Sequence, residues 1–243
     1  TVVLLSQPSA DVTVAVASND PGEGTASPAS LTFTAQNWNA PQAVTVHGVD
    51  DFIADGNQVY TIVDSPAVST DTGYSGLDPD DVTVTNLDND SAGFVVGATN
   101  GLVTTEGGGT AQFTVVLQSQ PLADVTVPVT SNDLTEATVA PATLTFTAQN
   151  WNAPQTVTVT GVDDRLADGD QPYVIVLAPA VSSDAGYSGV DPDDVMGMNL
   201  DNDTAGFLVT PTSGLQTTEG GGTDTYTVVL LSQPSADVTV AVA

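Results

Sequence analysis

The sequence contains no cysteine, one histidine and a single positively charged side chain, Arg165. The absence of cysteine excludes disulfides and thiolate metal sites, and zinc would lack its usual cysteine and histidine ligands. Nucleic acids and anionic membrane surfaces are recognised through lysine and arginine, so we expect neither as a partner. No apolar run approaches the roughly 20 residues of a membrane-spanning helix, and we expect no membrane insertion.

The chain has 30 acidic residues and one basic residue, and its formal net charge is −29. Hydrophobic residues make up 40% of the 243-residue chain. That share is enough for a packed core and is unlike disordered sequences of high charge. A charge of this size disfavours the compact state unless counter-ions neutralise it. The composition therefore favours a folded protein that binds cations.

Three sequence strings recur at one constant spacing, which is the signature of a repeat array. They are LTFTAQNWNAPQ at Leu31 and Leu144, NLDND at Asn86 and Asn199, and TEGGGT at Thr105 and Thr218. We call the number of residues from Leu31 to Leu144 the repeat spacing. The spacing is the same for all three strings, so no insertion or deletion separates the copies.

A longer stretch of identical sequence recurs at twice the repeat spacing. Residues 1–17 and 227–243 share the sequence TVVLLSQPSADVTVAVA, whereas the copy that lies between them and begins at Thr114 differs at several positions. We expect two module types to alternate, and this chain to be a window on a longer array. The predicted domains are 1–91, a module without its first strand, 92–203, a complete module, and 204–243, the start of a third.

Alternating β-branched residues dominate the sequence, for example in Thr156–Val159, and turn-forming residues interrupt them about every ten positions. No segment has the periodicity of an amphipathic helix. The pattern predicts an all-β fold of tandem immunoglobulin-like antiparallel β-sandwiches. In the complete module we expect strands near 93–104, 111–119, 124–131, 143–149, 155–162, 171–182 and 194–200.

In such a sandwich, the loops between consecutive strands alternate between the two ends of the domain. Every second loop therefore lies at the same end as the C-terminus of the last strand. That end collects nine of the module's acids, and like charges in one loop cluster raise one another's pKa. A bound cation resolves the repulsion, and Ca²⁺, which takes about 6–8 oxygen ligands in flexible geometry, fits best. The predicted calcium ligands are Glu106, Asp133, Glu136, Asp163, Asp164, Asp168, Asp170, Asp201 and Asp203.

The succession of TEGGGT, GVDD and LDND followed by AGF resembles the Calx-β domain, especially its relatives in large bacterial surface adhesins. The resemblance covers the whole chain. It implies an immunoglobulin-like sandwich that binds Ca²⁺ at one end through an early Glu, acids in two loops and an Asp cluster after the last strand. On this chain the early Glu matches Glu106, the acidic pair matches Asp163 and Asp164, and the terminal cluster matches Asp201 and Asp203.

The remaining acids of the module lie in the corresponding loops of the Calx-β pattern but not at its exact spacing. Asn202 departs from the pattern, which has an Asp at that position. The first module has an incomplete set, and the third contributes one ligand. These further candidate ligands are Asp20, Glu23, Asp50, Asp51, Asp55, Asp88, Asp90 and Glu219.

Other functions receive less support from the sequence. His47 is replaced by Thr160 in the next repeat, which argues against a catalytic base, and nine acids at an open sandwich end make a poor glycosidase cleft; we expect no enzyme. Binding of a glycan or receptor requires an exposed aromatic patch. The side chains available for it are Trp38, Trp151, Tyr74 and Tyr187.

The sequence thus predicts an extracellular, calcium-binding structural repeat of a cell-surface adhesin, filament or matrix fibre, with neighbouring modules of the same array as partners. Calcium would stiffen the junctions, because LDND runs into AGF without a linker and repeat arrays gain stability from neighbouring interfaces. A glycan- or receptor-binding module is the alternative. A cytosolic calcium sensor would need a coupled regulatory domain, which the sequence does not show.

Overall fold

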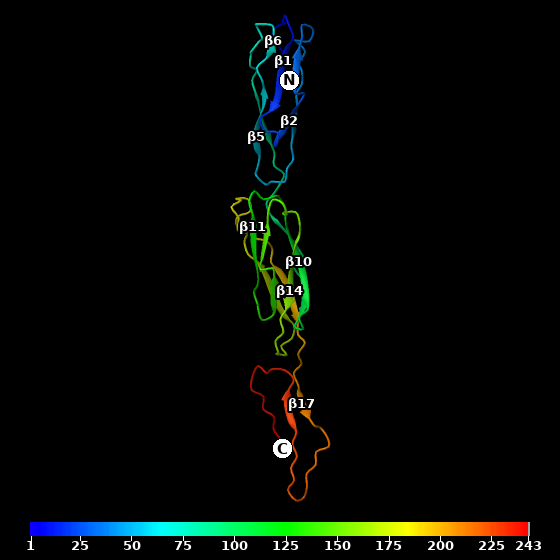
Figure 1. The fold of residues 1–243 in the computed structure, drawn as a ribbon. Helices are drawn as coiled ribbons and strands as arrows, with labels where there is room; N and C mark the ends of the chain where they lie inside the picture. Colours follow the sequence, from blue (N-terminus) through cyan, green and yellow to red (C-terminus); the bar gives the residue numbers. More distant parts are fainter. Residues whose placement is uncertain (243) are drawn as a thin grey trace. The chain divides into compact units, whose positions relative to one another are not determined.

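The computed structural model describes residues 1–242 and divides the chain into two compact units, Thr1–Ser91 and Ala92–Ala243. All regular elements in the described part are β-strands, eighteen in number (Figure 1). This confirms the predicted all-β class. In the described residues no helix is long and apolar enough to cross a membrane.

The first unit contains seven strands, which we call the first sandwich. One sheet has the order β3-β1-β5-β7, with β6 paired to β1, and a separate two-stranded sheet pairs β2 with β4. The strands are β1 (Val12–Ser18), β2 (Gly24–Ser27), β3 (Ser30–Phe33), β4 (Thr45–Gly48), β5 (Gln58–Asp64), β6 (Val68–Ser69) and β7 (Val82–Asn86).

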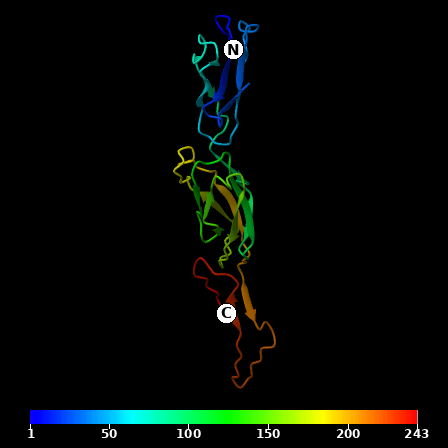
Figure 2. The same ribbon diagram turned by 45° about the horizontal axis from the view of Figure 1, so that its top comes forward.

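In the second unit, nine strands form two facing sheets, which we call the second sandwich (Figure 2). One sheet has the order β12-β14-β10-β8 and the other β13-β11-β15-β16-β9. The strands are β8 (Phe94–Gly97), β9 (Leu102–Thr105), β10 (Thr110–Leu117), β11 (Val125–Ser131), β12 (Ala137–Ala140), β13 (Thr143–Phe146), β14 (Gln155–Gly161), β15 (Gln171–Leu177) and β16 (Val195–Leu200).

The core follows from the alternation in the sequence. Along β14, Val157 and Val159 are fully buried while the threonines that alternate with them are half-buried or exposed, and β11 and β15 alternate in the same way. Side chains on a strand point to opposite faces in turn, so each strand contributes one face to the space between the sheets. The resulting cluster is dominated by Val, Leu, Ile, Phe and Tyr.

The expected single first strand, 93–104, is wrong. The structure divides it into β8, which pairs with β10, and β9, which runs parallel to β16 in the opposite sheet. Between them Ala98 and Gly101 have φ values of 68° and 78°. Residues in the left-handed region turn the chain sharply, so this segment crosses from one sheet to the other.

Two other strand boundaries also differ. The prediction has no strand at β12, which pairs with β14 immediately before β13 pairs with β11. The strand expected to reach residue 182 ends at Leu177, and beyond it only an isolated bridge joins Val181 to Thr126. Short crossover strands such as β12 carry too few alternating residues to be recognised in a sequence.

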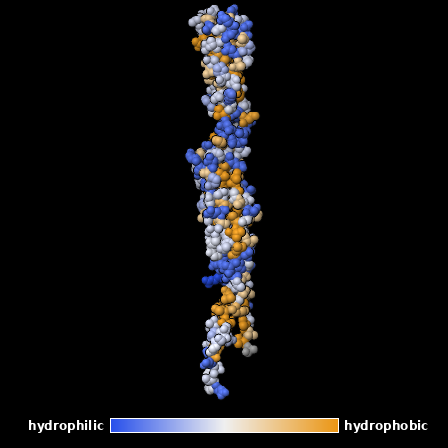
Figure 3. Space-filling view, turned by 90° about the vertical axis from the view of Figure 1, so that its right-hand side faces the viewer, coloured by the Kyte–Doolittle hydropathy of each residue, from blue (hydrophilic) through white to orange (hydrophobic). Residues whose placement is uncertain are grey.

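Residues 204–242, which we call the C-terminal segment, follow the second sandwich. They form a two-stranded hairpin of β17 (Phe207–Thr210) and β18 (Thr227–Leu230), and nearly all of their side chains are exposed. Apolar side chains cover much of this part of the surface (Figure 3).

Candidate metal centre

The acidic end of the second sandwich is built around two buried glutamates. The first, Glu106, follows β9 directly and is 2% exposed. Its backbone N–H donates to the carbonyl of Leu200 (3.1 Å), and its carboxylate Oε2 accepts from the backbone N–H of Asn202 (3.0 Å). The parallel pairing of β9 with β16 therefore places Glu106 beside the C-terminal end of β16, the last strand of the sandwich.

The second glutamate, Glu136, precedes β12 and is 7% exposed. Its Oε2 accepts a hydrogen bond from the side-chain Nδ2 of Asn199 (3.2 Å), and its backbone carbonyl accepts from the N–H of Val162 (2.9 Å). Asn199 is itself buried and also donates to the carbonyl of Val162 (3.0 Å). The segment before β12, the segment after β14 and strand β16 are thus tied together around the carboxylate.

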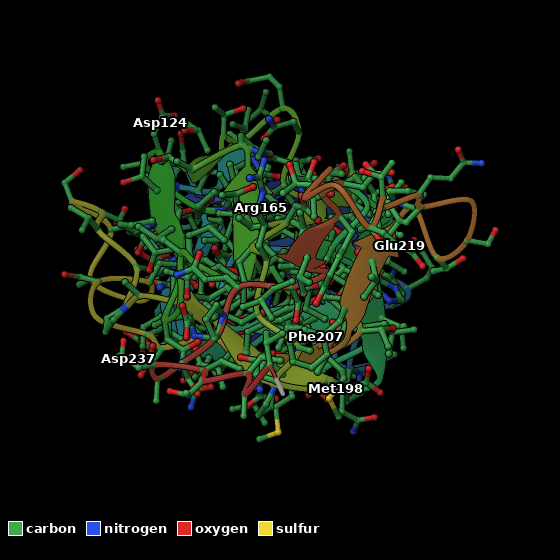
Figure 4. The ribbon with its side chains drawn as sticks, turned by 90° about the horizontal axis from the view of Figure 1, so that it is seen from below. Asp124, Arg165, Met198, Phe207, Glu219 and Asp237 are labelled. Carbon is green, nitrogen blue, oxygen red and sulfur yellow. The ribbon has the colours of Figure 1, made fainter. Side chains whose placement is uncertain are left out.

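Asp164 lies between the two glutamates. Carboxylate oxygens of Glu106, Asp164 and Asp203 all lie within 4.8 Å of one another, and so do those of Glu136, Asp164 and Asp168. Because Asp164 belongs to both groups, the geometry offers two adjacent cation positions with one bridging carboxylate. Figure 4 views the chain from below and labels Arg165, which follows Asp164 in the sequence.

Burial shapes the electrostatics of both glutamates. It is the main cause that raises the pKa of Glu106, and the charges of Asp201, Asp164 and Glu136 add to the rise. The pKa of Glu136 is also raised, again chiefly by burial and also by neighbouring aspartates. Removing a carboxylate from water disfavours its ionised form unless a cation or hydrogen-bond donors compensate. Both glutamates are therefore suited to a cation that restores their charge.

Four of the nine predicted ligands lie outside these two groups and bond to neighbouring polar groups. Asp133 accepts from the hydroxyl of Thr135, and Asp163 accepts from the amide of Asn202 (3.2 Å). Asp170 and Asp201 accept backbone N–H groups. Hydrogen bonds of this kind lower the pKa of Asp133 and of Asp201. These residues shape the loops around the five acids that the structure brings together.

The first sandwich repeats part of this arrangement. Asn86 Nδ2 donates to Glu23 Oε2 (3.2 Å) and to the carbonyl of Val49 (2.9 Å), as Asn199 does in the second sandwich. A pocket of about 280 Å³ opens beside Glu23 and is also lined by Asp50, Asp51 and Asp88.

The acids of the first sandwich affect one another's pKa, but their carboxylate oxygens do not converge as those of the second sandwich do. Burial, followed by the charges of Asp88, Asp50 and Asp51, raises the pKa of Asp90. Within residues 1–91 no three acids bring their oxygens within 4.8 Å. Asp20 and Asp55 make local contacts with backbone N–H and side-chain amide groups.

Glu219, the candidate from the third module, lies in the exposed loop between β17 and β18 (Figure 4). It belongs to neither group of converging acids in the described chain. Its repeat counterpart is Glu106, which occupies the same place in the preceding copy of TEGGGT.

Sequence reasoning missed the supporting role of Asn199 and Thr104. The hydroxyl of Thr104 donates to Asn199 Oδ1 (3.0 Å), so both polar groups of this buried amide are satisfied. A signal was available, because NLDND begins with Asn in both copies. A buried amide beside an acidic cluster is typical of a group that orients a ligand.

The aromatic candidates for glycan binding do not form an exposed patch. Tyr187 is buried, and its hydroxyl donates to the carbonyl of Ser119 (2.6 Å). Trp151 packs against the core of the second sandwich, and Trp38 is half-buried.

The sequence matches no family model and no curated protein. Among solved structures, CBD12 from CALX1.2 is similar at a TM-score of 0.39 with 14% identity, over 80% of this chain and 90% of that one. The calcium binding domain CBD12 of CALX1.1 is similar at 0.31 with 18% identity, over 79% and 74% of the two chains. Domains 1–6 of the surface layer protein SbsC are similar at 0.31 with 14% identity, over 93% and 25%. Structural similarities at these TM-scores support no conclusion about the residues of this chain.

Proposed function

We propose that this chain is a calcium-binding structural repeat of an extracellular adhesin, filament or matrix fibre. The observation that carries the proposal is the position of Asp164, whose carboxylate lies within 4.8 Å of two separate acid pairs, each containing a buried glutamate. Two such pairs around one shared carboxylate match a pair of neighbouring cations bridged by an aspartate.

The donor set fits calcium better than other ions. All candidate ligands are carboxylates, and backbone carbonyls lie nearby, which suits a hard cation that takes about 6–8 oxygens at variable geometry. Magnesium usually keeps several waters and uses few carboxylates. Zinc prefers His and Cys, and the chain has no Cys and one His, outside this cluster.

Contacts with the C-terminal segment support a role at a junction. The carbonyl of Arg165 accepts from the backbone N–H of Gln233 (2.6 Å), and Leu166 bridges to the same residue. A pocket of about 500 Å³ lies between Asp163, Asp164 and Asp203 on one side and Leu230–Gln233 on the other. A cation held by Asp164 would order the loop that makes these contacts and so stiffen the connection to the next repeat.

The cellular setting follows from the chemistry. Extracellular modules bind calcium with dissociation constants near 10⁻⁴–10⁻³ M, which suits the millimolar calcium outside cells. Arg165 is the only residue after which a trypsin-like protease could cut. We therefore place the protein at the cell surface or in a secreted fibre, with repeats of the same array as its partners and without catalytic activity.

Thermal unfolding of the full chain tests the proposal. We expect the midpoint to rise by several degrees when EDTA is replaced by millimolar Ca²⁺, because a ligand that binds only the folded state stabilises it. Mg²⁺ at equal ionic strength is the control for general charge screening and should raise the midpoint less. An equal response to both ions, or to neither, would contradict the calcium assignment.

A further inference from the structure

The outer face of one sheet of the second sandwich carries exposed apolar side chains. Along β9 and β16 burial alternates, and the side chains that point away from the core include Val103 (51% exposed), Met196 (60%) and Met198 (39%). The two methionines are the only ones in the chain. On the neighbouring strand β15, Pro172 and Val174 also point away from the core.

Strand pairing places these five side chains next to one another. Met198 lies opposite Val103 on β9 and opposite Pro172 on β15, and Met196 lies opposite Val174. Neighbouring strands are about 4.8 Å apart, so the side chains form one continuous patch, which we call the methionine face. In Figure 4 the labelled side chain of Met198 points outward from the ribbon.

The methionine face is particular to the second sandwich, because the corresponding positions of the other module type are polar. Four positions differ in this way at the repeat spacing. The polar residues and their counterparts in the face are Thr61 and Val174, Thr83 and Met196, Thr85 and Met198, and Gln216 and Val103. All four side chains of the face point away from the core, so core packing does not require the change. A contact outside the sandwich accounts for adjacent surface positions that become apolar together.

No charged residue interrupts this face. The strands of the sheet contain no Asp, Glu, Lys or Arg, although the chain carries 30 acidic residues. The acids of this sandwich lie in the segments between strands, such as Asp170 before β15 and Asp194 before β16. Exposed charges farther apart than a Debye length, about 8 Å at physiological salt, are largely screened from each other. Two chains of net charge −29 can therefore meet through this face without bringing their acids together.

We propose that the methionine face is a contact surface for the same face of a second copy of this chain, so that copies associate side by side. An uncharged face offers nothing to orient a charged partner, whereas it is complementary to its own copy in a two-fold pairing. The two module types alternate along the sequence, so the face recurs at every second module of an array. Another copy of the same array presents its faces at the same intervals.

The chemistry of the side chains suits such a contact. Two sheets that pack face to face lie about 10 Å apart, and their side chains interdigitate. Methionine has an unbranched and flexible side chain that adapts to an opposing surface. Met196 and Met198 can therefore fill the spaces between the side chains of the other copy, and both copies remove apolar surface from water.

The size of the face sets the strength of the association. An apolar patch on the order of a few hundred Å² is large for the surface of a monomer, but a stable complex buries roughly 800 Å² per partner. One pair of second sandwiches should therefore associate weakly, with a dissociation constant of about 10⁻⁴–10⁻³ M. Several pairs along two arrays would reinforce one another, because each further contact forms within a complex that is already joined.

The two methionines report on this face directly, since labelling with methyl-¹³C methionine gives one NMR signal for each. The full chain is studied in EDTA, so that the result does not depend on the calcium assignment. Between about 10 µM and about 1 mM, a range that spans the expected dissociation constant, both signals should shift together and sedimentation velocity should show a growing average size. A monomer at about 1 mM overturns the proposal. So do larger species that leave both methionine signals unchanged.

Substitutions taken from the other module type test which residues make the contact. Val103→Gln and the double variant Met196→Thr/Met198→Thr introduce residues that the repeat already carries at these positions. Each should raise the dissociation constant measured by sedimentation at least tenfold. Val95→Thr is the matched control, because Val95 is 50% exposed on the outer face of the other sheet, and this variant should change little. Equal weakening by the control and by the variants of the face contradicts the proposal.

Salt distinguishes a contact between copies from one that depends on charge attraction. Raising NaCl to about 0.5 M shortens the Debye length to about 4 Å. Association through the methionine face should then become stronger, because salt screens only the repulsion between the two acidic chains. An association that weakens at high salt would depend on attraction between charges, and that result would assign the contact to a different surface.

Discussion

The amide of Asn199 donates to the carboxylate of Glu136, with 3.2 Å between Nδ2 and Oε2, and Asn86 makes the same contact with Glu23 at the same distance. In each sandwich the asparagine also donates to the carbonyl of the residue after Gly161 or Gly48. In each sandwich one amide, buried at Asn199 and half-buried at Asn86, thus fixes both a candidate ligand and the backbone of the adjacent acidic loop.

Asn199→Ala should lower the free energy of unfolding by about 2 kcal/mol, because it removes the buried amide that accepts from the Thr104 hydroxyl and donates to the Val162 carbonyl and to Glu136. Urea unfolding of the full chain measures the loss. Asn202→Ala is the control, since its exposed side chain bonds only to the exposed Asp163. Equal losses for the two variants would show that Asn199 does not organise the site.

Asp164→Asn should remove most of the calcium-induced rise in the unfolding midpoint, because Asp164 is the carboxylate common to both acid groups. Its neighbour Asp163 is exposed and lies in neither group, so Asp163→Asn should keep most of the rise. At millimolar Ca²⁺ and the affinity of an extracellular module, the difference amounts to about 1 kcal/mol. A similar loss in both variants would indicate general charge reduction rather than a bridging ligand.

Trypsin provides a local probe, since Arg165 is the only residue after which it can cut. The N–H of Leu166 donates to Asp164 Oδ1 (2.7 Å), so a cation held by Asp164 and Asp168 would restrain the bond that is cleaved. We expect cleavage to slow severalfold in millimolar Ca²⁺ relative to EDTA, as followed by the appearance of two fragments. An unrelated peptide substrate controls for the effect of calcium on trypsin. An unchanged rate would place the cation away from this loop.

The effect of pH should reverse with calcium. Glu106 and Glu136 have pKa values raised above the ordinary 4.5, so the metal-free folded state holds protons that the unfolded state has released, and stability falls as pH rises through that window. A bound cation keeps both groups ionised, and its contribution is lost as pH falls. The stabilisation by Ca²⁺ should therefore be large at pH 7 and shrink toward pH 4.5.

Asp133 and Asp201 have lowered pKa values, so their contribution is lost only below the ordinary 3.8 and does not overlap this range. Thermal unfolding at several pH values, with and without Ca²⁺, measures the difference. A calcium effect that stays constant down to pH 4.5 would contradict the assignment of the buried glutamates as ligands.

The sequence predicts the all-β class and the gathering of acids at one end, because both depend on patterns that survive without side-chain detail. Alternation along segments such as 155–161 specifies a strand with one buried face. Loop parity then places Glu106 and Asp164 at the same end, where the structure brings their oxygens within 4.8 Å.

The sequence does not predict which of the nine acids converge. Asp163 and Asp164 are adjacent and chemically identical, yet only Asp164 belongs to the two groups of converging acids. That choice depends on the pairing of β9 with β16 and on hydrogen bonds such as the one from Asn202 to Asp163. The change of sheet between β8 and β9 is set by backbone conformation at Ala98, a residue with no intrinsic preference for positive φ.

A crystal structure of the chain grown with Ca²⁺ or a lanthanide substitute tests the central claim most directly. The account predicts two anomalous-scattering peaks in the second sandwich, one between Glu106, Asp164 and Asp203 and one between Glu136, Asp164 and Asp168. Peaks elsewhere, or none at this end in crystals soaked with millimolar cation, would contradict it.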